Sequence, residues 1–433
     1  MKVLNQSIEN STVKKTMLRI LPFLFICYVI AYLDRINLGF AALEMNADLT
    51  LSAEAFGLLS GIFFIGYMIF EIPSNMIMHK VGAKIWIARI LITWGIISVC
   101  TAFVQTAMHL YIARFLLGIA EAGFFPGIIL YLTYWFRSKE RARASAAFML
   151  AWPVCSIVGA PVSIYIMDNI TWGGLAGWRW MFVLEGLPAI ILGIVTFFYL
   201  ENRPENAKWL SGEEKNWLEN ELRFEKSQSH DRKETSKLEM FKGLKIWKLS
   251  FVCFTIFCSM YALAFFLPTI IKSLSTELSN TDIGRLSIIP PIVGIPSMIF
   301  WAWSSDKRNE RIKHLVACCL ITASAFTIGG FMDSAWLLMV SISIVAIGLM
   351  GLLVLFVSYV SMSFTESTAP IGIATVNTLG SLGGFVGPFL FGMLSFSKGM
   401  FLIGALIFLS SVILLTFRQS KGVKIKVDPD QSL

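Results

Sequence analysis

Charged residues are scarce in this chain. Lys, Arg, Asp and Glu make up 15% of its 433 residues, whereas hydrophobic residues make up 56%, and a soluble domain carries about 25% charged residues. A soluble protein of this length buries many apolar side chains, but not in uninterrupted runs of membrane length. Such runs, near the roughly 20 residues that a spanning helix needs, recur from Leu18 almost to Phe417. The pattern indicates a membrane protein with many spans and excludes a soluble protein.

Histidine and cysteine are also few, and they are poorly placed for chemistry. The four histidines are scattered at expected helix ends and loops, where they form neither a nucleophile–base pair nor a metal cluster. The seven cysteines lie inside apolar runs without the spacing of a metal site or a disulfide framework, so we interpret them as small buried hydrophobic residues. We therefore expect no enzyme activity, no metal and no cofactor. The residues are His79, His109, His230 and His314, with Cys27, Cys100, Cys155, Cys253, Cys258, Cys318 and Cys319.

A cleavable signal peptide is not expected, because the first residues are polar and no small-residue cleavage site follows the first apolar run. The chain has 36 Lys and Arg against 28 Asp and Glu. This excess does not indicate nucleic-acid binding, since the basic residues lie in short connections between apolar runs. Basic residues in that position set the orientation of a membrane protein.

The apolar runs predict an all-α membrane protein of twelve transmembrane helices in two pseudo-symmetric six-helix bundles. We expect an N-terminal bundle over 1–200 and a cytoplasmic loop over 201–246, in which 213–226 forms a short amphipathic helix on the membrane surface. A C-terminal bundle and a short cytoplasmic tail follow over 247–433. Two such halves are a known transporter plan, with the binding site between them. The expected spans are 19–41, 54–78, 84–105, 109–136, 143–167, 178–200, 247–271, 282–304, 313–331, 335–363, 370–394 and 398–418.

The connections predict the orientation. Every second connection is rich in Lys and Arg, and the connections between them contain almost none. By the positive-inside rule, both termini are expected in the cytoplasm of a cell whose inner membrane holds the protein. The basic residues include Lys14, Lys15, Arg19, Lys80, Lys84, Arg137, Lys139, Arg141, Arg143, Lys307, Arg308, Arg311, Lys313, Lys421, Lys424 and Lys426.

Ionisable residues inside the spans are concentrated in the first half, and each is a candidate functional group because burying a charge in the membrane is costly. Asp34 lies about 15 residues beyond Arg19, or roughly 22 Å along a helix, and Glu121 lies equally far before the end of its span. Arg114 is two turns before Glu121 on the same helix face, and Arg35 adjoins Asp34. These four residues predict a charge-balanced cluster in mid-membrane, with Asp34 and Glu121 as proton-coupling groups.

Structural roles compete with this interpretation. The four charges could be salt bridges that only hold helices together. For Glu71 and Arg89 we favour a mutual pair near the cytoplasmic ends of their helices, and for Glu185 a cap or brace of its helix. Aromatic residues, among them Trp152 and Tyr261, are candidates to line a cavity. Clustered Gly and Pro in the fourth, fifth and eleventh spans fit close packing or flexing during transport.

Several segments together resemble a known family. They are residues 32–37 (YLDRIN), 72–75 (IPSN), 114–126 (RFLLGIAEAGFFP), 177–186 (GWRWMFVLEG) and 372–388 (GIATVNTLGSLGGFVGP). Across nearly its whole length the chain resembles the major facilitator superfamily, and more narrowly its anion:cation symporter family. Bacterial permeases for 4-hydroxyphenylacetate, tartrate and sugar acids are the most similar members.

The resemblance implies proton-driven symport of a small organic anion, such as an aromatic or hydroxylated carboxylate, by alternating access. In similar proteins, acids matching Asp34 and Glu121 carry protons, and arginines matching Arg35 and Arg114 bind carboxylate or pair with those acids. The expected partners are this anion, protons and the lipid bilayer, and a monomer suffices. A proton-independent facilitator or exporter of a small metabolite is the alternative. Positions that face substrate in sugar-acid permeases match Tyr32, Tyr67 and Asn377.

The chain departs from the family pattern in places. His79 replaces an acid in the loop after the second span. A polar position of the fifth span in the sugar-acid permeases corresponds to Val154, beside Trp152 and Pro153. The loop after the tenth span, which contains Glu366, lacks a common basic pair. The apolar Val154 leaves room for an aromatic or less polar acid.

Overall fold

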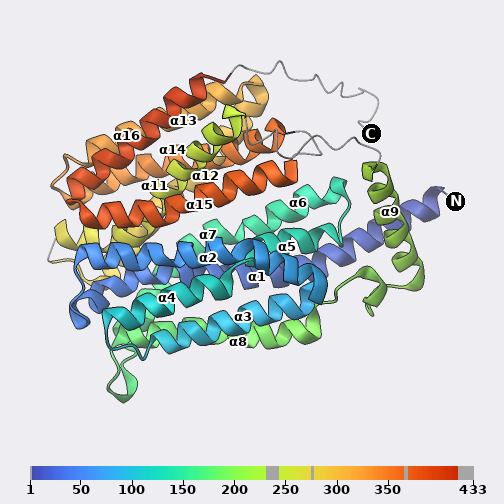
Figure 1. Ribbon diagram of the computed structural model, residues 1–433, viewed down its shortest axis with the longest axis horizontal. Helices are drawn as coiled ribbons and strands as arrows, with labels where there is room; N and C mark the ends of the chain where they lie inside the picture. Colours follow the sequence, from blue (N-terminus) through green and yellow to red (C-terminus); the bar gives the residue numbers. More distant parts are fainter. Residues whose placement is uncertain (1, 231–242, 275–276, 365–368, 418–433) are drawn as a thin grey trace.

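The computed structural model describes residues 2–230, 243–274, 277–364 and 369–417, and no strand occurs among them. Twelve helices in this part of the chain are long and apolar enough to cross a membrane. They run side by side as one elongated bundle (Figure 1). The predicted all-α, twelve-span class is therefore confirmed. Glu366 and the predicted tail residues Lys421, Lys424 and Lys426 lie outside the described residues.

The first half contains six spans built from eight α-helices. Two spans are each made of a consecutive pair, α4 with α5 and α6 with α7. The short helices η1 (Trp172–Gly174) and η2 (Pro204–Asn206) lie in connections. The helices are α1 (Lys2–Asp48), α2 (Ala53–Val81), α3 (Ala83–Thr101), α4 (Ala107–Glu121), α5 (Phe124–Thr133), α6 (Ser138–Met149), α7 (Ala151–Asn169) and α8 (Gly177–Tyr199).

The second half follows helix α9 (Gly212–His230), close to the predicted amphipathic segment. Each of its six spans is one continuous helix. They are α11 (Leu244–Leu274), α12 (Asn280–Arg308), α13 (Arg311–Gly329), α14 (Ala335–Ser363), α15 (Ala369–Met393) and α16 (Phe396–Leu415).

The fourth span is broken, although the sequence predicts one continuous helix over 109–136. Gly123 takes a left-handed backbone with φ of 86° between α4 and α5. A Cβ atom on Gly123 would lie 2.4 Å from Ser74 Oγ of α2, so glycine also permits close contact of the two helices. Pro126 is tolerated because it stands in the first turn of α5, where its missing N–H is not needed. Glu121 is thus the last residue of α4, directly before this break.

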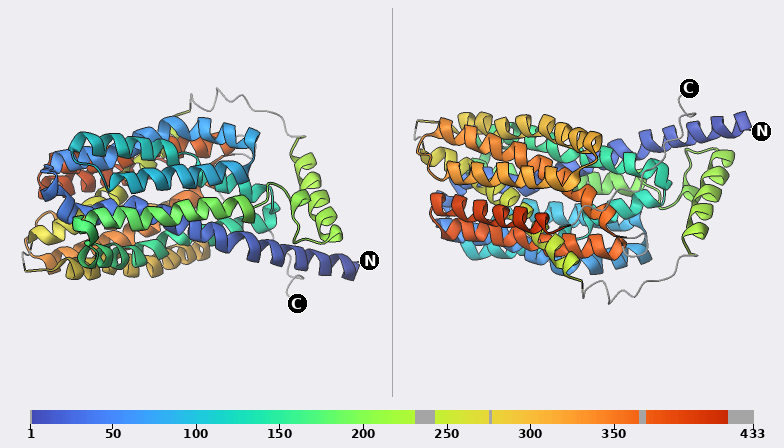
Figure 2. Two further views of the ribbon diagram at one scale, coloured as in Figure 1. Left: turned by 90° about the horizontal axis from the view of Figure 1, so that it is seen from below. Right: turned by 90° about the horizontal axis from the view of Figure 1, so that it is seen from above.

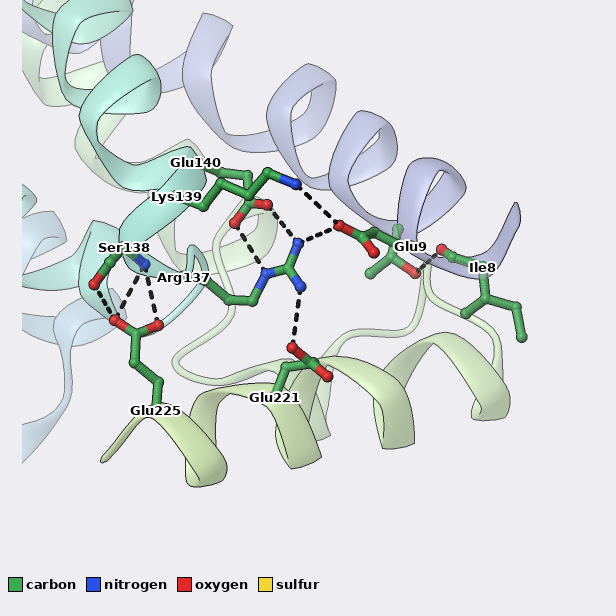
Figure 3. A network of polar contacts seen from close by, with 9 residues as sticks. Ile8, Glu9, Arg137, Ser138, Lys139, Glu140, Glu221 and Glu225 are labelled. Atoms are coloured by element: carbon green, nitrogen blue, oxygen red, sulfur yellow. Dashed lines mark hydrogen bonds and ion pairs between the residues drawn. The ribbon is translucent and has the colours of Figure 1, made fainter. Parts of the chain in front are cut away.

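Helix α1 is longer than the predicted span 19–41, because its first turns project from the bundle and pack against α9 (Figure 2). Arg137, just before α6, joins these elements (Figure 3). Its guanidinium contacts Glu9 of α1 at 2.6 Å and Glu221 of α9 at 3.0 Å. Lys15 of α1 adds an ion pair with Glu214 of α9 at 2.7 Å. Helix α9 is therefore fastened to the first half. We call this end of the bundle the α9 face.

The two halves pack on each other chiefly through α1 with α11, α2 with α15, and α7 with α12. Figure 1 shows α2 and α15 lying side by side. At the face opposite α9, Asp168 of α7 accepts hydrogen bonds from Asn280 at 2.9 Å and Thr281 at 3.2 Å, both of α12. The halves thus make direct polar contact at the face opposite α9.

Candidate functional site

Asp34 and Arg35 are consecutive in α1, so their side chains point in directions about 100° apart. Asp34 faces α3, where the Trp94 indole donates a hydrogen bond to its carboxylate at 2.9 Å and the Ser98 hydroxyl donates another. Helix α3 packs closely on α8, and a Cβ atom on Gly95 would lie 2.9 Å from the carbonyl oxygen of Gly186. This packing holds the α3 donors against Asp34. Neutral donors, not an arginine, are its direct partners among the described residues.

Arg35 points from α1 toward α4 and the second half. It forms an ion pair with Glu121 and donates a hydrogen bond from Nη1 to Tyr261 Oη of α11 at 3.2 Å. Its guanidinium also lies 5.1 Å from the Phe63 ring centre and 5.6 Å from that of Tyr67, within range of cation–π attraction. Arg35 therefore connects the acid at the break in the fourth span with a residue of the other half.

Arg114 is the most isolated charge of the cluster. It is 1% exposed, and none of its three guanidinium nitrogens makes a hydrogen bond with another described residue. Its charge interacts with Asp34 and Glu121 at longer range, and its guanidinium lies 5.1 Å from the Phe63 ring centre. Glu121 Oε2 is likewise buried without a hydrogen bond among the described residues. A buried guanidinium without a partner is costly, and an anion would supply the missing acceptors.

A cavity of about 140 Å³ lies between the halves, and the four charged residues of the cluster are not among its lining residues. Tyr32 and Trp152 are among its walls, and their rings meet edge to face with centres 5.9 Å apart. The lining residues come from α1, α7, α11, α12 and α14. They are Tyr32, Ile36, Phe40, Trp152, Pro153, Ser156, Met260, Leu263, Ala264, Leu267, Pro268, Ser287, Pro290, Pro291, Ile295, Ile342, Ala346, Leu349 and Met350.

Glu185 of α8 is a second buried acid of the first half. It is 2% exposed. Asn37 Nδ2 of α1 donates to one of its oxygens at 2.8 Å, and Ser163 Oγ of α7 donates to the other at 2.8 Å. Glu185 thus braces three helices from the middle of α8 and does not cap that helix. Asp34 also interacts with it electrostatically.

One pairing prediction was wrong. Among the described residues Glu71 and Arg89 form no ion pair with each other. Glu71 instead accepts a long hydrogen bond from Thr378 of α15 at 3.5 Å. Arg89 lies 3.9 Å from the Trp86 ring centre and donates a long bond to the carbonyl of Ala120 at 3.4 Å. Glu71 contacts α15 and Arg89 contacts α4, so the two side chains point toward different helices.

The other predicted residues divide into three groups. Tyr32 and Trp152 line the cavity, whereas Tyr261 and Tyr67 contact Arg35. Asn377 of α15 lies outside the cavity wall, and so does Val154, whose side chain is 39% exposed. Val154 therefore faces away from the cavity and does not set its polarity.

The partners of the buried acids were missed. Trp94, Ser98 and Ser163 are neutral residues in apolar runs, and one sequence gives no sign of which way they point. Asn37 could have been recognised as a partner from the sequence, because it is a polar amide within three residues of Asp34 and Arg35 in the same apolar run. Among the described residues no group of three or more His, Cys, Asp or Glu could hold a metal ion.

Proteins that are already named or solved resemble this chain in sequence and in fold. The family model of the Major Facilitator Superfamily matches residues 24–388 and 274–431. A protein of Agrobacterium vitis named "Putative tartrate transporter" is 42% identical over 96% of this chain and 97% of its own length. "Putative metabolite transport protein NicT" of Pseudomonas putida is 39% identical over 92% and 91%. A bacterial homologue of the human lysosomal transporter Spinster, solved inward-facing and unoccupied, has a TM-score of 0.75 at 18% identity over 95% and 99%.

Proposed function

The chain belongs to the Major Facilitator Superfamily, and we propose that it is a proton-coupled symporter that takes up a small organic anion by alternating access. The observation that carries this proposal is the arrangement around Arg35. One guanidinium pairs with a buried acid, Glu121, and bonds to Tyr261 of the other half, while Arg114 nearby has no hydrogen-bond partner among the described residues. The relative named for tartrate supports a carboxylate as substrate.

Protonation of Glu121 would remove the negative charge that holds Arg35. The freed guanidinium, with Arg114, could then bind a substrate carboxylate, because arginine offers paired donors that match the two oxygens. Proton and anion would enter together, since each charge compensates the other beside the buried residues Glu121 and Arg114. Asp34 would exchange its proton separately, because the direct partners of its carboxylate among the described residues are Trp94 and Ser98 and not an arginine.

Alternating access would come from rocking of the halves about this cluster. The polar contacts of Asp168 with α12 would break when the face opposite α9 opens. We place the α9 face in the cytoplasm and the protein in the inner membrane. The basic connections support this orientation. One chain supplies both halves, so we propose a functional monomer.

The test is substrate-dependent proton uptake by the purified protein in liposomes that contain a pH-sensitive dye. Addition of a transported carboxylate should acidify the lumen when no pH gradient is imposed, and liposomes without the protein give the baseline. Uptake of the labelled acid without any proton movement would contradict symport and favour a facilitator. A proton flux out of the lumen as the acid enters would favour an exchanger that can export.

A further inference from the structure

Glu71 of α2 is a buried acid that the proposed mechanism does not use. It is 6% exposed, and it accepts a hydrogen bond from Thr378 Oγ1 of α15 at 3.5 Å. A buried carboxylate is costly unless it is closely paired and hydrogen-bonded, and 3.5 Å is at the outer limit of a hydrogen bond. This long contact therefore compensates little of the cost of placing an acid here.

The hydroxyl that reaches Glu71 is used differently from its neighbours on α15. Thr375 and Ser381 donate their hydroxyl protons to backbone carbonyls of their own helix, at 2.8 Å and 2.9 Å. This is a common arrangement for hydroxyl residues inside helices. Thr378 lies between these two residues and donates across the boundary to Glu71 of the other half. The contact thus joins the two halves directly.

The separation of α2 and α15 changes along their length. Toward the face opposite α9, a Cβ atom on Gly57 would lie 2.6 Å from the carbonyl oxygen of Pro388. One turn further along α2, a Cβ atom on Gly61 would lie 2.8 Å from another carbonyl oxygen of α15. About three turns beyond that, toward the α9 face, the tips of Glu71 and Thr378 make the contact. The two helices therefore diverge toward the α9 face, and this pair lies where they part.

Glu71 is also within electrostatic reach of the charge cluster. It follows Tyr67 by one turn on the same face of α2, and the Tyr67 ring centre lies 5.6 Å from the Arg35 guanidinium. The positive charge of Arg35 attracts Glu71. The acid at the α2–α15 boundary thus shares Arg35 with Glu121, so the charge state of the cluster acts on this boundary.

We propose that Glu71 and Thr378 form a gate between the halves. When the α9 face closes, α2 and α15 approach each other, and Thr378 gives Glu71 a short hydrogen bond that stabilises the closed state. Both are positioning residues, since neither is proposed to touch the substrate. This inference rests on the alternating access of the proposed function, and it depends neither on proton coupling nor on the identity of the substrate.

The test measures the distance between two spin labels across the α9 face by pulsed electron paramagnetic resonance, with the full-length protein in lipid nanodiscs. The labels are attached at Lys80→Cys on α2 and Ile373→Cys on α15, two exposed positions near this face. Cys100 is exposed and is replaced by serine, whereas the other cysteines are buried. Asp168→Ala serves as the parent. Loss of its hydrogen bonds to α12 weakens the opposite face and should populate the closed state of the α9 face.

The parent should show a short-distance, closed population beside a long-distance, open one. Thr378→Val removes the donor and keeps the shape, so the ratio of closed to open should fall about 10-fold, the effect of one hydrogen bond to a charged group. Thr378→Ser keeps the hydroxyl and should stay within about 2-fold of the parent. Glu71→Gln keeps a carbonyl acceptor without the charge and should lower the ratio about 3-fold, because a charge-assisted hydrogen bond is about twice as strong as a neutral one.

Thr375→Val is the matched control. It removes a hydroxyl of the same residue type from the same helix, but that hydroxyl serves the backbone of α15. The ratio of closed to open should stay within about 2-fold of the parent.

The outcomes separate the gate from alternating access. A loss of the closed population in Thr378→Val that Thr378→Ser and Thr375→Val avoid supports the gate. Equal ratios in Thr378→Val and Thr375→Val would overturn the gate and leave alternating access standing. An unchanged ratio in Glu71→Gln would overturn the role of the carboxylate charge. A single long-distance population in the parent and in every variant would overturn both the gate and alternating access.

Discussion

Arg35 of α1 donates a hydrogen bond to the Tyr261 hydroxyl of α11 at 3.2 Å, and this contact crosses from the first half to the second. The same guanidinium is paired with Glu121. The charge cluster of the first half therefore has a direct polar link to the half that moves against it in the proposed mechanism.

The variant Tyr261→Phe tests this link. Loss of a hydrogen bond to a charged group costs about 1.5 kcal/mol or more, which is about a 10-fold change in an equilibrium constant. We expect the substrate concentration for half-maximal uptake to rise about 10-fold, and the melting temperature to fall by a few degrees at most. Tyr359→Phe is the control, because Tyr359 packs on Phe417 with ring centres 5.8 Å apart, outside the cavity wall. Equal effects of both variants would contradict a special role for Tyr261.

Glu185 should matter for stability. In Glu185→Ala the buried donors of Asn37 and Ser163 lose their acceptors, and the missing volume adds to the cost, so we expect a loss of about 2–4 kcal/mol in the free energy of unfolding. Glu185→Gln keeps a carbonyl acceptor in the same shape and should lose much less. Thermal unfolding in detergent measures both. Glu54→Ala at the exposed start of α2 is the control. A Glu185→Ala variant as stable as wild type would refute the bracing role.

The break in the fourth span predicts a contrast between two glycines. Gly123→Ala places a Cβ atom on a left-handed backbone, which costs about 1–2 kcal/mol, and sets it against Ser74. At Gly127 the nearest obstacle is the flexible Met78 side chain at 2.9 Å. We expect Gly123→Ala to lower the melting temperature and to reduce uptake, and Gly127→Ala to do so less. The same melting temperature for both variants would count against a structural need for the break.

The attachment of α9 should depend on pH. Burial disfavours the ionised form of Glu214, but hydrogen bonds from Lys15, the Ser211 backbone and Ser11 outweigh it and lower its pKa to about 2. A carboxyl whose pKa is lower in the docked state stabilises docking fully above its ordinary pKa of 4.5. That contribution disappears as the pH falls from there toward 2.

Hydrogen exchange of the α9 backbone measures this effect. Exchange should accelerate as the pH falls below about 4.5, after correction for the intrinsic pH dependence of exchange. The matched variant Glu214→Gln removes the titrating group and should exchange fast at every pH. An α9 in the wild type whose protection does not change over this range would show that Glu214 contributes nothing to docking.

The sequence predicted the spans because a soluble fold rarely contains an uninterrupted apolar run of membrane length. It also predicted that Asp34, Arg35, Arg114 and Glu121 form one cluster, because depth along a helix can be counted from the ends. The contacts within the cluster could not be predicted. Whether Asp34 meets an arginine or Trp94 depends on the rotation of α1 relative to α3, which close packing sets and hydropathy does not.

The same limit applies to the break at Gly123 and to Val154. A glycine in an apolar run is compatible with a continuous helix, and only the approach of Ser74 shows why the helix stops. Val154 is two residues from Trp152, so the two side chains point about 200° apart. The family resemblance pointed to the turn of α7 that contains both residues. The rotation of α7 about its own axis determines that Trp152, and not Val154, lines the cavity.

Glu121→Gln tests the central claim, that a proton on Glu121 releases Arg35 for the substrate. Glutamine resembles the protonated acid but cannot give up a proton. In liposomes, we expect this variant to exchange labelled for unlabelled substrate across the membrane at a rate near wild type, yet to fail to accumulate substrate against its gradient when a proton gradient is imposed. Accumulation as strong as wild type would contradict the claim.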